Sequence, residues 1–135
     1  MRKKINWKFL IELGVFVLQY IATQVVTFAA SMLLPGMVNL QQGRPAIFAL
    51  IVGICFSLGS FLIGWLAVRR NWLSAGSGLP VRLAGTLVGA FLPLAVALLL
   101  YGTPEAGNPF FFISVWGSIL GFHLPAWLSR SSPAN

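Results

Sequence analysis

Residues 9–34, FLIELGVFVLQYIATQVVTFAASMLL, form a long apolar run that decides the fold of this chain. A helix turns about 100° per residue, so it brings Glu12, Gln19, Thr23 and Thr27 within about 100° of one another. We call these four residues the polar stripe. A polar side chain that faces hydrocarbon costs free energy, so we expect the polar stripe to face protein or trapped water. The first run is therefore predicted to be the helix against which the others pack.

The composition of the chain indicates an integral membrane protein. Of its 135 residues, 58% are hydrophobic and 8% are charged, whereas about 25% of an ordinary chain is charged. A spanning helix needs about 20 apolar residues, and four stretches provide them: residues 9–34, 46–68, 81–101 and 109–128. They lack the alternation of a membrane β-barrel. We therefore expect a single all-α domain, residues 1–135, folded as an antiparallel bundle of four transmembrane helices.

The basic residues are divided unevenly between the two sides of such a bundle. Eight of the nine fall on one side: Arg2, Lys3, Lys4, Lys8, Arg69, Arg70, Arg82 and Arg130. Arg44 and the acidic Glu105 fall on the other side. The positive-inside rule then places both termini in the cytoplasm, and we expect the inner membrane of a bacterium. The basic residues are expected to set this orientation and to contact anionic lipid, without binding nucleic acid.

Small residues recur at helical spacing in the second, third and fourth spans, and they predict close helix packing. Residues of this kind let two helix backbones approach each other. They are Gly53, Ser57, Ser60, Gly64, Gly85, Gly89, Gly117 and Gly121. A short connection at residues 102–108 makes the third and fourth spans neighbours. Residues 37–44 are expected to form an outer loop, and no internal repeat is expected.

Few ionisable side chains lie inside the spans. Glu12 and His123 are expected at similar depth, where they could form an acid–imidazole pair that handles protons. The alternative is that each bonds locally, Glu12 to Lys8 and His123 to a carbonyl or a lipid headgroup. His123 could instead be an axial ligand of a haem or a chlorophyll-type pigment, with Gly121 admitting the flat ring.

The chain lacks the residue sets that catalysis requires. It has no aspartate, a single histidine and a single cysteine, Cys55. These residues cannot form a nucleophile–base–orienter set, an internal disulfide or a Cys/His metal cluster. We therefore expect neither enzyme activity nor a metal site.

Three functions fit these features. We favour a non-catalytic accessory subunit that packs, through its small-residue helix faces, within a larger membrane complex such as an energy-transducing one. A small transporter or channel would instead work as a self-oligomer and use Glu12, the polar stripe and His123 as a path. A pigment- or haem-binding subunit would use His123. Stoichiometric partner proteins, solute flux and a visible absorption band would distinguish them.

Overall fold

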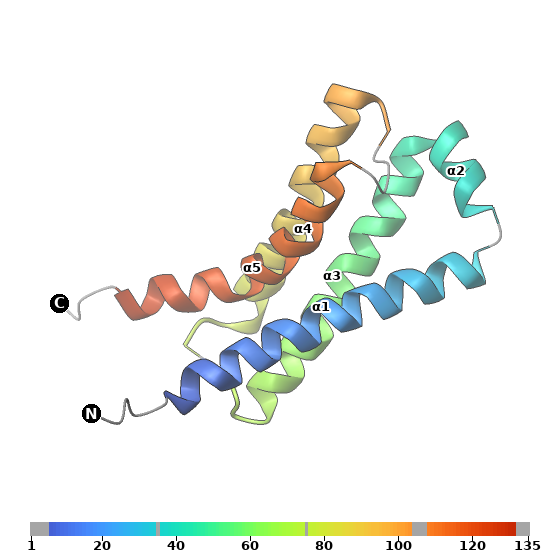
Figure 1. Cartoon of the computed structure of the whole chain (residues 1–135). Helices are drawn as coiled ribbons and strands as arrows, with labels where there is room; N and C mark the ends of the chain where they lie inside the picture. The colour runs from blue at the N-terminus through green and yellow to red at the C-terminus, as the bar shows by residue number, and fades with distance from the viewer. Residues whose placement is uncertain (1–5, 35, 75, 104–107, 132–135) are drawn as a thin grey trace, which may run out of the picture.

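The computed structural model describes residues 6–34, 36–74, 76–103 and 108–131, and the regular structure within these ranges is entirely helical. The helices are α1 (Trp7–Leu33), α2 (Met37–Gly43), α3 (Pro45–Arg69), α4 (Leu79–Tyr101) and α5 (Pro109–Ser131), shown in Figure 1. By length and composition, α1, α3, α4 and α5 could each cross a membrane. The all-helical class and the four long apolar helices are thus confirmed, and they indicate a multi-pass membrane protein.

The long helices differ from the predicted spans only at their ends. α1 begins at Trp7 rather than at residue 9, and α5 continues to Ser131 rather than ending at residue 128. A proline lies in the first turn of α3, α4 and α5, where its missing N–H is not needed. The longer α5 makes Arg130 part of the helix.

The segment predicted as an outer loop contains the short helix α2. Gly36, with a φ of 99°, turns the chain just before it, and glycine adopts this backbone conformation without strain. Met37 is buried in a cluster with Phe48 and Val52 of α3, and Leu40 packs against that cluster. The segment was predicted to be a loop because it is mainly polar, but the apolar side chains of Met37 and Leu40 hold it against α3.

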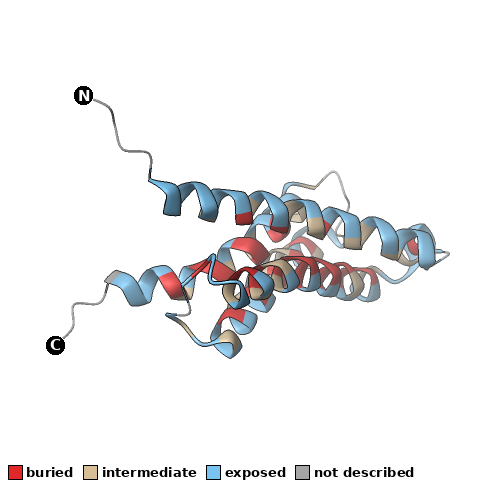
Figure 2. Cartoon of the chain, turned by 90° about the horizontal axis from the view of Figure 1, so that it is seen from below, coloured by how far each residue is buried: buried red, intermediate tan, exposed pale blue. Residues whose placement is uncertain are grey.

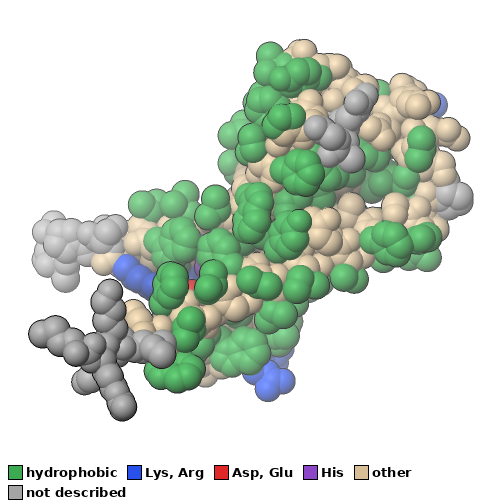
Figure 3. Space-filling view, viewed as in Figure 1, with side chains coloured by type: hydrophobic (Ala, Val, Ile, Leu, Met, Phe, Trp, Pro, Cys, Tyr) green, Lys and Arg blue, Asp and Glu red, His purple; other side chains and the backbone are tan. Residues whose placement is uncertain are grey.

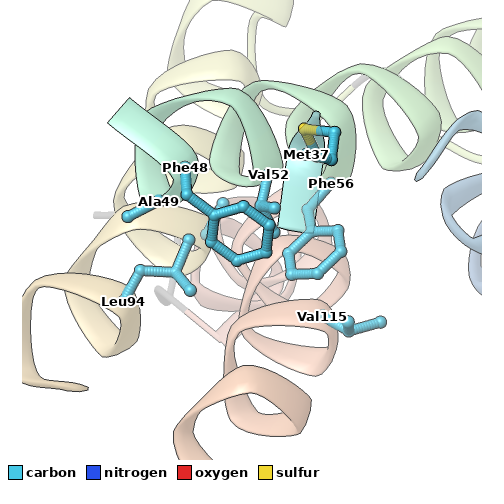
Figure 4. Close-up of a cluster of buried hydrophobic side chains, with 8 residues drawn as sticks. Met37, Phe48, Ala49, Val52, Phe56, Leu94 and Val115 are labelled. Atoms are coloured by element: carbon cyan, nitrogen blue, oxygen red, sulfur yellow. The ribbon is translucent and has the colours of Figure 1, made fainter. Parts of the chain in front are cut away.

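α3, and not α1, is the helix against which the others pack. It contacts each of the other helices, and 50% of its most apolar stretch is buried, against 17% for α1. Figure 2 shows α1 as mostly exposed. The largest core cluster brings Phe48 and Phe56 of α3 together with Leu94 of α4 and Val115 of α5, as Figure 4 shows. The polar stripe suggested that the other helices pack against α1. They pack instead against α3, which has small residues on its closely packed faces.

The backbones of α4 and α5 touch directly through glycines. A Cβ added at Gly89 would overlap the carbonyl oxygen of Gly117, and one added at Gly85 would overlap that of Gly121. Only glycine allows so close an approach. The small residues predicted for these two spans therefore lie against each other as two glycine pairs.

α4 and α5 each contain one copy of a short internal repeat, although no repeat was predicted. The two copies are GTLVGAFLP at residues 85–93 and GSILGFHLP at residues 117–125. Each ends in a proline, which removes the helical hydrogen bond to the carbonyl four residues earlier, at Gly89 and at Gly121. Each of these oxygens lies against a glycine of the other helix, Gly117 or Gly85, where a Cα–H group can approach it. The repeat thus pairs freed carbonyls with open glycine faces.

α5 bends in its second half, so that its end leaves α4 (Figure 1). Pro125 lies in this half, and a proline inside a helix is a common cause of a kink. The start of α1 and the end of α5 lie at the same end of the molecule (Figures 1 and 2). This is the end that carries the charged site described next.

Candidate functional site

A buried polar cluster of Gln19, Ser60 and His123 lies where α1, α3 and α5 meet. Gln19 Nε2 donates to the Ser60 carbonyl at 2.9 Å, and Gln19 Oε1 lies 2.8 Å from His123 Nε2. Because a carbonyl can only accept, the amide nitrogen faces Ser60 and the amide oxygen faces His123. The imidazole therefore carries a proton on Nε2 and donates it to Gln19. We call this group the amide–imidazole cluster; one side chain ties three helices together.

Aromatic rings enclose the imidazole of His123. Phe16 stacks on it with the ring centroids 4.3 Å apart, Phe122 meets it edge-on at 5.3 Å, and Trp127 lies at 5.7 Å. Ligation of a haem or a pigment through Nε2 would break the bond between His123 and Gln19. Among the described residues, no three His, Cys, Asp or Glu side chains come together in a group that could hold a metal ion.

An ion pair joins α1 to α5 near the ends of the two helices. Arg130 Nη1 donates to Glu12 Oε1 at 2.9 Å, and Arg130 Nη2 donates to the Ser74 hydroxyl at 2.8 Å. The side chains of Arg130 and Glu12 are 47% and 24% exposed. An ion pair this exposed stabilises a protein by about 0–1 kcal/mol. Its main effect is to position three segments: α1, α5 and the link between α3 and α4.

The two hydrogen-bonded contacts between α1 and α5, Gln19 with His123 and Glu12 with Arg130, share one register. Glu12 and Gln19 are seven residues apart, and so are His123 and Arg130. Seven residues make two turns of helix, about 10 Å. The predicted neighbours Glu12 and His123 therefore bond to different partners. The extension of α5 to Ser131 explains the difference, because it places His123 deeper than its distance from residue 128 suggested.

The rest of the polar stripe bonds within α1. Thr23 Oγ1 donates to the Gln19 carbonyl, and Thr27 Oγ1 donates to the Thr23 carbonyl, each at 2.8 Å. Thr23 is buried against Gly59 of α3, where an added Cβ would lie 2.6 Å from the Thr23 Cα. Gly59 was not among the predicted packing positions. The polar stripe faces the neighbouring helices. Near the middle of α1, Gln19 is its residue that bonds to other helices, α3 and α5.

The predicted small residues of α3 lie against large side chains. Gly53 lies under the ring of Phe91 and Gly64 lies under the ring of Phe122. Ser57 is buried and donates to the Gly53 carbonyl at 2.8 Å. The two glycines therefore pack against phenylalanines of α4 and α5 rather than against other small residues, whereas Ser60 lies against Gln19 of α1.

Arg82 belongs to the site, although the sequence indicated only an orientation charge. It is 1% exposed near the start of α4. Its Nε donates to the Ser77 hydroxyl at 3.1 Å, its Nη2 donates to the Ser74 carbonyl, and its guanidinium lies 4.9 Å from the centre of the Phe122 ring. Its Nη1 is buried and has no hydrogen-bond partner within the described part of the chain. One feature of the sequence could have indicated the buried position of Arg82: a serine- and glycine-rich link lies just before the helix that carries it.

Comparisons of the chain with protein-family models, with curated proteins and with solved structures found no match. The functional conclusion therefore depends on the site. The amide–imidazole cluster and the Glu12–Arg130 pair both connect helices of this chain to one another.

Replacing Gln19 with leucine is expected to lower the free energy of unfolding by about 1–2 kcal/mol, because the His123 N–H would be buried without an acceptor. Denaturant or thermal unfolding of the purified protein in detergent measures the change. Gln24→Leu is the matched control, since Gln24 lies on the same helix and is exposed. Equal effects of the two substitutions would show that the buried amide does not hold the helices together.

Proposed function

We propose that this chain is a non-catalytic accessory subunit of a larger complex in the cytoplasmic membrane of a bacterium. In this proposal it crosses the membrane four times as an antiparallel bundle with both termini inside. The uneven distribution of basic residues supports the orientation. The common position of the start of α1 and the end of α5 (Figures 1 and 2) agrees with it. The opposed order of the glycine pairs, Gly85 with Gly121 and Gly89 with Gly117, also fits an antiparallel bundle.

The use that the chain makes of its polar side chains supports a role in assembly. Gln19 and His123 bond to each other, Thr23 bonds within its own helix, and Glu12 pairs with Arg130. A solute path would need polar groups that face an aqueous space. Here Gln19 bonds to Ser60 of α3 and to His123 of α5 across the helix contacts, which is how polar residues hold membrane helices together.

The observation that carries the proposal is the position of Gln24. Its side chain is exposed, and no hydrogen bond joins it to any residue that the structure describes. Gln24 lies about 6 Å along the helix from Tyr20, the midpoint of α1, which is well inside a hydrocarbon core about 30 Å thick. An amide that faces lipid at this depth is unfavourable. A transmembrane helix of another subunit would supply the missing hydrogen bonds.

The face of α1 around Gln24 can receive such a helix. Val17, Ile21 and Phe28 are 52%, 50% and 62% exposed, and helical spacing places them on the same side as Gln24. The expected partner is therefore an apolar transmembrane helix that carries one polar side chain near its middle, such as Ser, Thr, Asn or Gln.

Purification of the tagged full-length chain in a gentle detergent tests the proposal. We expect partner membrane proteins in stoichiometric amounts, and Val17→Trp should remove them because a bulky ring would separate the two helices. Val88→Trp on α4 is the matched control, since Val88 is also a valine and is 60% exposed. A homogeneous self-oligomer, or partners that persist in Val17→Trp, would contradict the proposal.

A further inference from the structure

A cavity of about 770 Å³ opens between the start of α1, the link after α3 and the end of α5. Its charged lining consists of Lys8, Glu12 and Arg130, two cations and one anion, and Ser74 lines it beside Arg130. Figure 3 shows the charged side chains at this end of the molecule within a mainly hydrophobic surface. The cavity arises because α1 lies along α3 and meets α5 chiefly through long side chains.

An apolar groove of about 260 Å³ continues from this cavity along α1. It is lined by Ile11, Gly14, Val15, Leu18 and Trp72, and Ile11 and Trp72 also line the cavity. From Ile11 to Leu18 the helix advances about 10 Å toward its middle. A Cβ added at Gly14 would meet no atom within 4 Å. The groove therefore has free space where the helix has no side chain.

The geometry points to a binding site for one anionic phospholipid, with its phosphate in the cavity and one acyl chain in the groove. The lining has a net charge of +1, and Lys8 forms no ion pair with a described residue. Arg82 adds positive potential behind the cavity wall, because its Nη2 is bonded to the carbonyl of the lining residue Ser74 and its Nη1 has no partner among the described residues. A basic pocket at the membrane surface is a recognised way to hold an anionic headgroup.

The junction between the two spaces favours a lipid over a soluble anion. A soluble phosphate compound would use the charged cavity alone and leave the groove empty. Trp72 lies at the junction and is 51% exposed, and tryptophan prefers the boundary between headgroups and hydrocarbon. A molecule with an anionic end and an apolar chain matches both spaces at once. This inference does not depend on whether the chain has a protein partner.

Titration of the purified full-length chain with phosphatidylglycerol in detergent micelles, followed by native mass spectrometry, tests the site. We expect one tightly bound lipid per chain. Lys8→Ala should weaken its binding about five-fold, because one basic residue near a membrane surface contributes about that factor. Arg70→Ala removes the same charge from an exposed position outside the cavity lining and should leave this binding unchanged.

A second pair of variants tests the groove. Gly14→Leu should weaken binding several-fold, because the new side chain would occupy the free space, whereas Gly14→Ala should bind nearly as well as the natural chain. Equally tight binding of glycerol phosphate would show a site for a soluble anion, and equally tight binding of phosphatidylcholine would show that charge does not select the ligand. Either result, or wild-type binding by both Lys8→Ala and Gly14→Leu, would overturn the inference.

Discussion

Replacing Gly89 with alanine is expected to lower the free energy of unfolding by about 3 kcal/mol, the upper end of the usual cost of overpacking. The added methyl would overlap the carbonyl oxygen of Gly117. A backbone oxygen cannot rotate out of the way as a side chain can. The two helices would have to separate, which would also weaken the bond from the Ser114 hydroxyl to the Ala90 carbonyl. Denaturant unfolding in detergent measures the loss.

Gly14→Ala is the matched control for this substitution. A Cβ at Gly14 would meet no atom within 4 Å, and alanine is a better helix former than glycine by about 1 kcal/mol. The same chemical change should therefore be neutral or slightly stabilising at Gly14 and strongly destabilising at Gly89. Similar unfolding curves for the two variants would mean that α4 and α5 do not pack backbone against backbone.

The helical class of this protein was predictable because the membrane makes it a one-dimensional problem. A run of about 20 apolar residues must span as a helix that satisfies its own backbone. The apolar run at residues 9–34 predicted α1 for this reason. The position of a span in the bundle is not encoded so simply. α1 carries the polar stripe, yet α3 is the central helix, because close packing depends on which small residues meet which partners.

The partners of the site residues could not be predicted, because they depend on the register between two helices that are far apart in the sequence. The depths of Glu12 and His123 were measured from the ends of the predicted spans. α5 is three residues longer at its end than predicted, and it is bent. His123 therefore pairs with Gln19, and Arg130 pairs with Glu12. The seven-residue spacing in both helices was present in the sequence, but it acquires meaning only once the helices are known to be neighbours.

Arg82 shows a different limit of sequence reasoning. A basic residue at the end of a predicted span fits the positive-inside rule equally well whether its side chain extends to the headgroups or folds inward. The side chain of Arg82 folds inward because the link after α3 supplies two acceptors. The Ser74 carbonyl and the Ser77 hydroxyl accept hydrogen bonds from its guanidinium. Its inward position in turn connects the link to α5 through the ring of Phe122.

Arg82→Ala is therefore expected to lower the free energy of unfolding by about 2–3 kcal/mol, the usual range for losing buried hydrogen bonds to a charged group. Arg82→Lys should recover only part of this, because an ammonium group has neither the planar fork that reaches two serines nor the flat face that lies over Phe122. Unfolding in detergent measures both effects, and limited proteolysis of the link measures its release from α4.

Arg70→Ala separates this structural role from the effect of charge. Arg70 is exposed at the same end of the molecule, so its loss reduces the positive charge equally and should change the stability by no more than about 0.5 kcal/mol. If Arg82 serves only orientation, the two alanine variants should unfold alike and their links should be cleaved at equal rates. If the guanidinium holds the link, Arg82→Ala alone should be cleaved faster there, and Arg82→Lys should fall between the two. Because the Ser74 hydroxyl also accepts from Arg130, a released link would weaken the wall of the proposed lipid site as well, so the affinity of Arg82→Ala for phosphatidylglycerol should fall together with its stability.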